Sequence, residues 1–286
     1  MTRLTSNLIC EVTSSLTERD ATLRTEIGKD LQMLAFKAAG ICSLPTENRP
    51  LVAVVPMTCG GGVIDGFSTS VMEIASHIGF RSFVTAGTDV SGFAEALKSG
   101  ADLILMADDD EFIAVNMSNN RLTTNTHCTA LGYVEVLKEA EGSLWGKDVT
   151  VIGAGRVGAE AVALLCSQGA HVHIHDVDPE RSNELSAEFQ DVIVHDDIET
   201  AVRSSRLILN ASPATLHEAW FQDGSFVSWP GVPFRMIPGP DPSRLTYIHD
   251  PIEIGVAVMI AKAYSLGEER DEDALPAHAD PMLVIY

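Results

Sequence analysis

Hydrophobic and polar residues follow two patterns along most of this chain, one with helical spacing and one in which short apolar runs alternate with amphipathic stretches. Over residues 15–39, apolar side chains recur at every third or fourth position, which predicts an amphipathic helix. The next stretch, "SLPTENRP", holds two prolines and ends that helix. From residue 51 to residue 107, short apolar runs alternate with amphipathic stretches in the order strand, helix, strand, helix, strand. This order predicts a parallel sheet with right-handed crossovers.

The alternation begins again after Gly146, behind a connecting helix predicted over residues 126–141. Strands are predicted over residues 148–153, 170–176, 206–212 and 224–229, and helices over residues 156–169, 179–189 and 253–266. We therefore expect a two-domain α/β protein with N-terminal helices. Its expected parts are helices in 1–48, an α/β substrate-binding domain in 49–128, a Rossmann dinucleotide-binding domain with its connecting and closing helices in 129–268, and a tail in 269–286 to which no structure is assigned.

Composition narrows the partners that this fold can have. The chain has 286 residues, of which 45% are hydrophobic, and 19 basic residues face 40 acidic ones for a net charge of -21. Such a charge repels nucleic acid and anionic membranes but suits a cationic small molecule. No apolar run is long enough to span a bilayer, and the first residues lack the apolar core of a signal peptide, so we expect a cytoplasmic protein.

Cysteine and histidine usage favours neither disulfides nor a metal site. The five cysteines are widely spaced and include no CxxC pair, as expected for reduced thiols. Three histidines alternate in "HVHIHD" (171–176), which fits one face of a strand. Few partners with zinc-ligand spacing lie near them, so we expect no metal.

One glycine-rich loop has the features of a dinucleotide site. "GAGRVG" places Gly153, Gly155 and Gly158 in GxGxxG spacing between a predicted strand and a predicted helix. In this motif the first glycine allows the tight turn, the second lets the pyrophosphate approach the backbone, and the third lets the helix pack on the strand. The N–H groups that open the helix then bind the phosphates.

The next strand ends at Asp176, where a carboxylate can accept hydrogen bonds from both ribose hydroxyls. Because it would repel the extra phosphate of NADP, we expect NAD, although nearby Arg181 argues for NADP. "NASP" (210–213) and "WPGVP" (229–233) follow two later strands and should lie at the nicotinamide end of the crevice.

The earlier glycine-rich stretch, "PMTCGGGVIDGF" (56–67), has neither GxGxxG spacing nor the lysine of a P-loop. The strand that follows also lacks an acid for a ribose. We therefore interpret it as a substrate loop, which offers its backbone together with Thr58, Cys59 and Ser68 at the carboxyl end of a parallel strand.

Acidic residues follow the third strand of the same half in "MADDDEF". This run is either a solvated turn or a clamp in which Asp108 binds an ammonium group. Asn125 either caps the connecting helix or reaches the same crevice. Cys128 has only the adjacent His127 and no acid to complete a nucleophilic arrangement, so we do not expect it to be catalytic.

Several of these strings together resemble the PylD family of pyrrolysine-forming dehydrogenases. The resemblance lies in "LVAVVPMTCGGGVIDGFSTS", "GFRSFVTAGTDVSGF", "LILMADDDEFIAVN", "NTHCTA", "VIGAGRVG", "PGVP" and the opening "MTRLT". It implies that NAD oxidises the terminal amine of 3-methyl-D-ornithyl-N6-L-lysine. The oxidised carbon then cyclises onto the α-amine with loss of ammonia, which forms the pyrroline ring of pyrrolysine.

The resemblance also implies roles for individual residues. The N-terminal helix (1–48) would be a lid carrying Leu4. Substrate contacts are implied for Leu4, Met57, Thr58, Ser68, Ala107, Asp108 and Asn125, and cofactor contacts for Gly153, Gly155, Arg156, Val157, Gly158, Asp176, Asn210, Ser212, Pro213, Pro230 and Gly231. The chain departs from the family in Cys59, where serine is usual, in the added charge of Glu253, and in a longer tail.

Two alternatives remain at this point, another NAD-linked amino-acid dehydrogenase and a non-catalytic NAD-binding sensor. A sensor needs no acidic substrate cleft, so the aspartate run favours an enzyme. We expect Asp108 to anchor a cationic, dipeptide-like substrate rather than to act as a general base, because a plain carboxylate is a weak base at pH 7. We also expect a homodimer, as is common for such enzymes.

Overall fold

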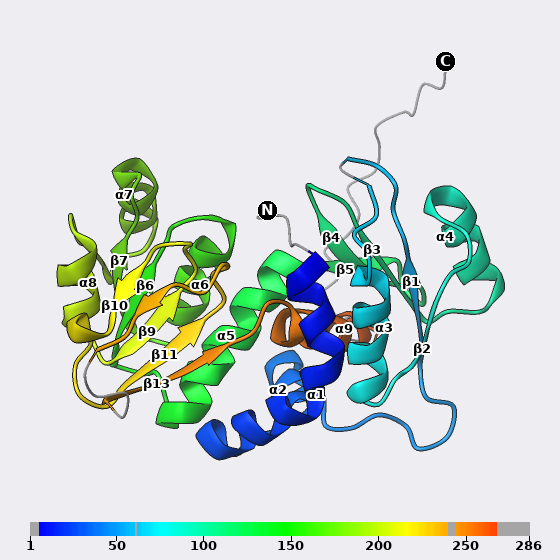
Figure 1. Cartoon of the computed structure of the whole chain (residues 1–286), viewed down its shortest axis with the longest axis horizontal. Coiled ribbons are helices and arrows are strands. Elements are labelled where there is room, and N and C mark those ends of the chain that lie inside the picture. The colour runs from blue at the N-terminus through cyan, green and yellow to red at the C-terminus, as the bar shows by residue number, and fades with distance from the viewer. Residues whose placement is uncertain (1–5, 61, 240–243, 268–286) are drawn as a thin grey trace, which may run out of the picture.

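The computed structural model describes residues 6–60, 62–239 and 244–267, with side chains from residue 16 onward. Two α/β units lie side by side and are joined by helices that run between them (Figure 1). This confirms the expected mixed α/β class with parallel sheets. Leu4 and the tail after residue 268, both named in the sequence predictions, lie outside the described residues.

The first unit is a five-stranded sheet. Its strands, in spatial order, are β2 (Arg81–Val84), β1 (Leu51–Val55), β3 (Leu103–Ala107), β4 (Phe112–Asn116) and β5 (Arg121–Thr124). β1 pairs in parallel with both β2 and β3, as the βαβαβ pattern predicted, and α3 (Phe67–His77) and α4 (Asp89–Lys98) are the crossovers. The antiparallel strands β4 and β5 were not predicted.

The second unit is a Rossmann domain. Its six strands, in spatial order, are β13 (Leu245–His249), β11 (Ser225–Trp229), β9 (Leu207–Asn210), β6 (Asp148–Ile152), β7 (His171–His175) and β8 (Val192–Val194). All neighbouring pairs are parallel, and counted along the chain the order is 6-5-4-1-2-3, which is the doubly wound dinucleotide-binding order.

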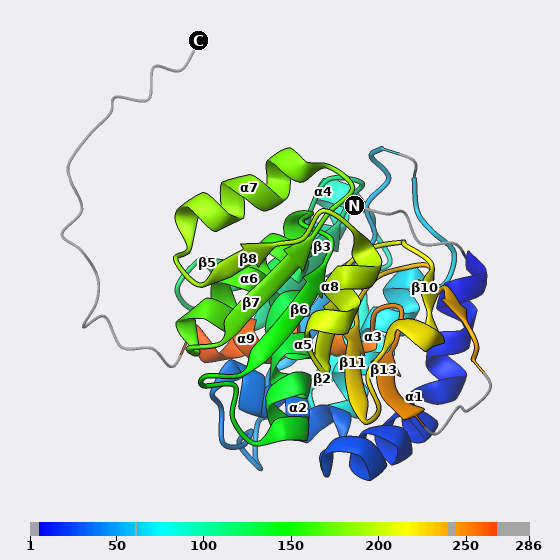
Figure 2. The same cartoon turned by 90° about the vertical axis from the view of Figure 1, so that its left-hand side faces the viewer.

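Helices and short elements complete the second unit (Figure 2). The helices are α6 (Arg156–Ser167), α7 (Pro179–Glu188), α8 (Ile198–Ser204) and the short 3-10 helix η1 (Glu218–Trp220), and a small parallel pair is formed by β10 (Leu216–His217) and β12 (Met236–Ile237).

The N-terminal region forms two helices where one was predicted over residues 15–39. α1 (Ser6–Ile27) ends before Gly28, which has a left-handed backbone with φ of 69°. Asp30 then caps α2 (Leu31–Ala39), because its carboxylate accepts a hydrogen bond from the Met33 N–H at 2.8 Å. The prediction of one continuous helix was wrong because apolar residues keep their helical spacing on both sides of this cap, so the pattern shows no break.

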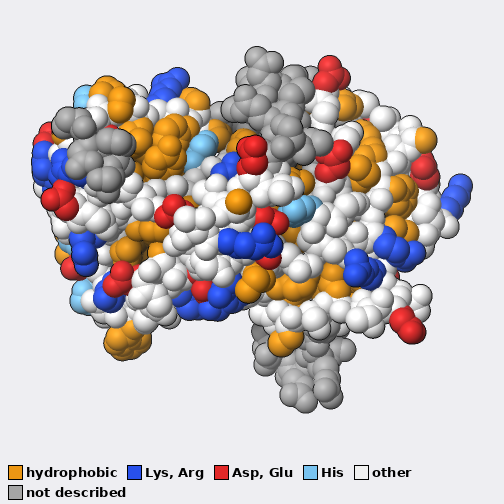
Figure 3. Space-filling model, turned by 60° about the horizontal axis from the view of Figure 1, so that its bottom comes forward, with side chains coloured by type: hydrophobic (Ala, Val, Ile, Leu, Met, Phe, Trp, Pro, Cys, Tyr) orange, Lys and Arg blue, Asp and Glu red, His pale blue; other side chains and the backbone are white. Residues whose placement is uncertain are grey.

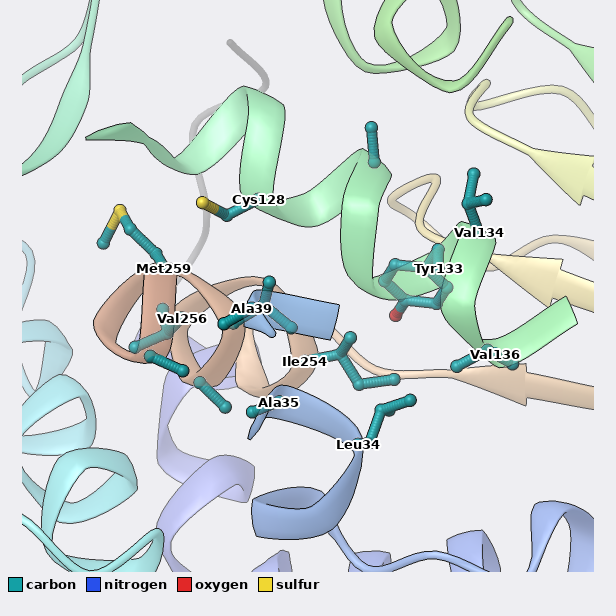
Figure 4. Packing of buried hydrophobic residues seen from close by; sticks show 14 of the residues in the cluster. Leu34, Ala35, Ala39, Cys128, Tyr133, Val134, Val136, Ile254, Val256 and Met259 are labelled. Atoms are coloured by element: carbon teal, nitrogen blue, oxygen red, sulfur yellow. The ribbon is translucent and has the colours of Figure 1, made fainter. Parts of the chain in front are cut away.

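The two units share a helical core made by α2, α5 (Asn125–Glu141) and α9 (Glu253–Ser265). α9 is buried almost all round, and Figure 4 shows its side chains packed against those of the other two helices. The contact between α5 and α9 is close: a Cβ on Gly132 would lie 2.6 Å from Cγ2 of Ile254. Burial of one such aliphatic side chain contributes about 1.5–3 kcal/mol, so the many buried side chains of α9 stabilise its packing against α2 and α5.

Charged side chains are dispersed rather than gathered on the face seen in Figure 3. There acidic and basic side chains are interspersed with apolar ones. The large negative charge of the chain is therefore not concentrated in one patch on that face. No helix among the described residues is long and apolar enough to cross a membrane.

Candidate functional site

A cavity of about 900 Å³ opens where the carboxyl ends of the two sheets face each other. Its volume falls in the range of roughly 300–1,000 Å³ that is usual for ligand pockets. One wall comes from the loops after β1 and β3, and the opposite wall comes from the start of α6 and the turns after β9 and β11. Loops at the carboxyl ends of parallel strands are where open α/β sheets bind their ligands.

Asp108 lies in the first wall as an ionised carboxylate. It directly follows β3 and opens the turn into β4, and its Oδ1 accepts hydrogen bonds from the N–H groups of Asp110 and Glu111, both at 2.8 Å. These backbone N–H groups hold the pKa of Asp108 below its ordinary value. A carboxylate fixed in this way is suited to bind a cation and is a poor proton acceptor at neutral pH.

Cys59 lies beside this carboxylate, with its Sγ 3.8 Å from Oδ2 of Asp108. Local desolvation and the negative charge of Asp108 raise the pKa of the thiol. The second cysteine considered in the sequence, Cys128, is buried, and burial raises its pKa to about 12. Both groups are therefore thiols at neutral pH, and neither has the character of a nucleophile.

Asn125 begins α5 and lines the cavity. The helix is capped by Thr124, whose side chain accepts a hydrogen bond from the His127 N–H at 3.3 Å, so Asn125 is not the cap. The Oδ1 atom of Asn125 is buried without a hydrogen-bond partner among the described residues. A ligand that reaches this amide would therefore find hydrogen-bonding capacity that the protein has left unused.

The glycine loop of the second wall fits a dinucleotide. A Cβ on Gly158 would lie 1.8 Å from the carbonyl oxygen of Gly153, so only glycine allows the helix to pack this closely on the strand. In contrast, a Cβ on Gly155 would meet nothing within 4 Å. Gly155 is the N-cap residue of α6, and no side chain caps the helix there and no acidic residue lies in its first turn. This is the cradle that a pyrophosphate requires.

Asp176 follows β7 and supports that loop. Its Oδ2 accepts a hydrogen bond from the Ala154 N–H at 2.6 Å, and its Oδ1 accepts one from the Asp178 N–H at 2.8 Å. Arg181 lines the cavity and pairs with Asp178 at 3.3 Å. Asp178 therefore contacts both the acid predicted to favour NAD and the base predicted to favour NADP.

The turns after β9 and β11 form the remaining part of this wall. Oδ1 of the buried Asn210 accepts hydrogen bonds from N and Oγ of Ser212, at 3.1 and 2.7 Å, and its backbone carbonyl accepts one from the Gly231 N–H at 2.8 Å. Asn210 thereby ties the two turns together and does not itself line the cavity. Ser212, Pro213, Pro230 and Gly231 do line it.

Arg156 links the two walls. It is the first residue of α6, and its Nη1 donates a hydrogen bond to the carbonyl of Asp110 at 2.8 Å and lies 3.4 Å from Oε1 of Glu111. Both partners belong to the turn that holds Asp108. The dinucleotide loop and the acidic turn are thus joined by a side chain predicted only to contact the cofactor.

The structure brings most of the predicted site residues to one cavity. Its lining includes the predicted Met57, Ser68, Ala107, Asp108, Asn125, Gly155, Arg156, Val157, Ser212, Pro213, Pro230 and Gly231. The cavity lining does not include Gly153, Gly158, Asp176 or Asn210, which contact or belong to the loops that form it. Thr58 does not line the cavity, because its N–H and Oγ donate hydrogen bonds to Asp89 at 2.8 and 2.6 Å.

Sequence reasoning missed the apolar part of the lining. Ile64 and Phe67 come from the substrate loop and the start of α3, Pro251 and Ile252 from the segment that joins β13 to α9, and Val256 from the first turn of α9. No local motif marks these residues, and the strand before the last three, β13, was not predicted. Within the described parts of the chain, no three His, Cys, Asp or Glu side chains are placed to hold a metal ion.

Comparison with known proteins agrees with this division into two halves. Residues 9–123 match the family described as the N-terminal domain of the pyrrolysine biosynthesis protein PylD. Residues 119–218 match the C-terminal domain family of alanine dehydrogenase and PNT. The second half is thus related to known dehydrogenase cofactor domains.

Two solved structures have a distantly similar fold. Shikimate 5-dehydrogenase from Thermus thermophilus is 16% identical, with a TM-score of 0.49 over 76% of this chain and 93% of its own. FolD from Campylobacter jejuni is 17% identical, with a TM-score of 0.49 over 93% of this chain and 97% of its own. Similarities this remote carry no conclusion about function.

Two curated relatives are much closer in sequence. The pyrrolysine synthase of Methanosarcina acetivorans is 32% identical over 91% of this chain and 98% of its own length. That of Methanosarcina barkeri is 31% identical over 91% of this chain and 97% of its own length. With the dinucleotide loop described above, these matches show that the chain belongs to the pyrrolysine synthase (PylD) family of dehydrogenases that use a nicotinamide dinucleotide.

Proposed function

We propose that this protein oxidises the terminal amine of 3-methyl-D-ornithyl-N6-L-lysine with NAD and releases pyrrolysine after ring closure. One observation carries the proposal. The ionised Asp108 lies across the cavity from the dinucleotide loop, so a cation bound to it is held facing the cofactor wall. The same cavity has an apolar lining that suits the methylene chains of such a substrate.

The reaction requires an amine that is neutral when hydride leaves its carbon. The bound nicotinamide would supply the acceptor for that hydride. A free alkyl amine has a pKa of about 10.4 and therefore arrives as an ammonium ion. Asp108 binds this ion, and because its own pKa is lowered, the proton passes to water rather than staying on the carboxylate. Asp108 therefore acts as an anchor and not as the base.

The overall change balances without another reactant. From its ammonium form the substrate would lose a proton to solvent and a hydride to the bound dinucleotide, which leaves a protonated imine at the terminal carbon. Water converts the protonated imine to an aldehyde and releases ammonium. The α-amine of the ornithine part then attacks the aldehyde and expels water, which closes the pyrroline ring. Walls that exclude bulk solvent protect these intermediates from side reactions.

We further propose that NAD is used in preference to NADP. The carboxylate of Asp176 stands at the end of β7, where the adenosine ribose lies in Rossmann domains, and its charge disfavours a 2′-phosphate. Arg181 opposes this preference but is already paired with Asp178. Comparison of kcat/KM with NAD and with NADP tests the choice, and a preference for NADP would contradict it.

The substrate is tested by turnover. Purified protein is mixed with NAD and either 3-methyl-D-ornithyl-lysine or D-ornithyl-lysine, and NADH, ammonia and the cyclised product are measured. We expect equal amounts of the three products. An analogue acetylated on its terminal amine should bind weakly and give no NADH. NADH formation only with simple amino acids would instead indicate another amino-acid dehydrogenase.

A further inference from the structure

One aspartate outside the cavity contacts the start of the substrate loop. Asp89 is the first residue of α4, which lies on the outer side of the first unit, away from the Rossmann domain (Figure 1). Its backbone is left-handed, with φ of 51°, a conformation that is uncommon for residues other than glycine. Such a backbone persists only where its surroundings hold it, and it is frequent near functional sites. The mechanism proposed above does not use Asp89.

Asp89 holds two residues of this loop. Its Oδ1 accepts a hydrogen bond from the Thr58 N–H at 2.8 Å, and its Oδ2 accepts one from the Thr58 hydroxyl at 2.6 Å. The N–H of Asp89 donates to the carbonyl of Pro56 at 3.0 Å. The hydrogen bonds from Thr58 hold the pKa of Asp89 below its ordinary value, so this group is a carboxylate at neutral pH. Asp89 therefore holds the chain on both sides of Met57.

The residues next to these contacts face the ligand. Met57, between the two held residues, lines the cavity, and so does Cys59 directly after them. Cys59 in turn lies beside the proposed anchor, with its Sγ 3.8 Å from Oδ2 of Asp108. Asp89 is not part of the lining. Its effect on a ligand therefore passes through the loop rather than through direct contact.

The rest of the loop is rich in glycine. Gly60, Gly62 and Gly66 all have a left-handed backbone, with φ of 65°, 82° and 82°. Glycine loses more conformational freedom than other residues when a chain becomes ordered. A loop of this kind needs fixed points to keep a single conformation, and Asp89 supplies one at its start.

We propose that Asp89 is a positioning residue for the amine substrate, which sets the place of Met57 and Cys59 in the cavity wall by holding Pro56 and Thr58. Thr58 then serves the shape of the wall rather than contact with the ligand. The inference deepens the proposed function and rests on it in its kinetic part.

The kinetic test is Asp89→Gly, which removes the carboxylate while glycine adopts the left-handed backbone without strain. The loop lies on the wall opposite the dinucleotide. KM for the amine should therefore rise roughly three- to tenfold, as for the loss of hydrogen bonds to an exposed charged group, with kcat and NADH affinity nearly unchanged. Glu95→Gln is the matched control, because Glu95 lies on the same helix but accepts from the N–H groups of Ala86 and Gly87. An unchanged KM in Asp89→Gly, or an equal loss of NADH affinity, overturns the proposal.

A second variant tests whether the effect passes through Thr58. Thr58→Val removes the hydroxyl donor and keeps the branched shape, so it should raise KM less than Asp89→Gly. The double variant should be no worse than Asp89→Gly alone, because both changes remove the same contact. Effects that multiply in the double variant would show that Asp89 acts by another route and would contradict the inference.

A third readout needs no substrate and so separates this inference from the proposed function. Hydrogen exchange of residues 57–60 should be about fivefold faster in Asp89→Gly than in the unsubstituted protein, and unchanged in Glu95→Gln. If the unsubstituted protein does not oxidise the amine, the proposed function fails and this measurement alone decides the inference. Equal exchange in Asp89→Gly and the unsubstituted protein would overturn it even if the enzyme turns over.

Discussion

At the scale of single residues, the proposed function depends on one carboxylate that two backbone N–H groups hold in place. The turn after β3 gives Asp108 two hydrogen bonds through Oδ1 and leaves Oδ2 beside Cys59. The neighbouring Asp110 donates one of those N–H groups but does not line the cavity with its own side chain. The two aspartates therefore form a matched pair for mutation.

Asp108→Asn should raise KM for the amine roughly 10- to 100-fold, because a hydrogen bond to a charged group contributes about 1.5–3 kcal/mol. NADH affinity should not change, and Asp110→Asn should behave like the unsubstituted enzyme. Steady-state kinetics and NADH fluorescence titration check both. A collapse of kcat with KM intact would show that Asp108 takes the proton, against the anchoring role.

Substitution of two glycines in the dinucleotide loop should affect different properties of the protein, NADH binding in one case and stability in the other. Gly155 has φ of -71° and open space above it, so Gly155→Ala should fold normally and weaken NADH binding about tenfold or more, since the methyl group occupies the phosphate cradle. Gly158→Ala places its Cβ against the Gly153 carbonyl and should cost about 1–3 kcal/mol of stability. Melting temperatures and NADH titrations distinguish them, and equal NADH affinity in Gly155→Ala would contradict the cradle.

The geometry of the dinucleotide loop could be predicted from the sequence because it is local. Gly153, Gly155 and Gly158 all belong to one turn between a strand and a helix. The turn is formed by consecutive residues, so their spacing alone predicts it. Thr58 could not be placed in the same way. Its hydrogen bonds go to Asp89 on another crossover, which only the folded chain brings near.

At the scale of elements, the regular βαβ rhythm was predicted well and the interruptions were not. The antiparallel pair β4–β5 is short, and β13 precedes the cavity segment without a distinct apolar run. The break between α1 and α2 depends on one glycine and one capping aspartate inside a continuous apolar pattern. The three strands are set by tertiary pairing rather than by local periodicity, whereas the helix break is set by local backbone and capping features that the apolar pattern does not show.

Deletion of residues 1–14 tests whether α1 and the segment before it serve the reaction. The described part of α1 starts at Ser6, so the deletion shortens the helix but keeps Arg19 and its hydrogen bond to the carbonyl of His249 at the end of β13. We expect lower turnover, because the cavity would exclude water less well, with unchanged NADH affinity. Turnover equal to that of the full chain would show that residues 1–14 do not act as a lid.

At the scale of the whole molecule, α9 couples stability to pH. The folded pKa of Glu253 is about 7, well above the value of a free glutamate. Between those two pKa values the folded state holds more protons than the unfolded state, so stability falls as the pH rises through this window and is constant above it. The loss is on the order of 3 kcal/mol, by about 1.4 kcal/mol for each pKa unit.

Glu253→Gln should remove that dependence. Its melting temperature should change less between pH 5 and pH 8 than that of the unsubstituted protein, and the variant should be the more stable of the two at pH 8. Differential scanning calorimetry in buffers of equal ionic strength measures both. An equal pH dependence in the two proteins would place the sensitive group elsewhere.

The central claim is that one cavity holds the amine on Asp108 and the dinucleotide on the facing glycine loop. A crystal structure with NADH and pyrrolysine bound tests this most directly. We expect the pyrophosphate over Gly155, the nicotinamide beside Ser212 and Gly231, and the ligand in contact with Asp108 and Asn125. A ligand bound elsewhere, or one that leaves Asp108 without contact, would contradict the account.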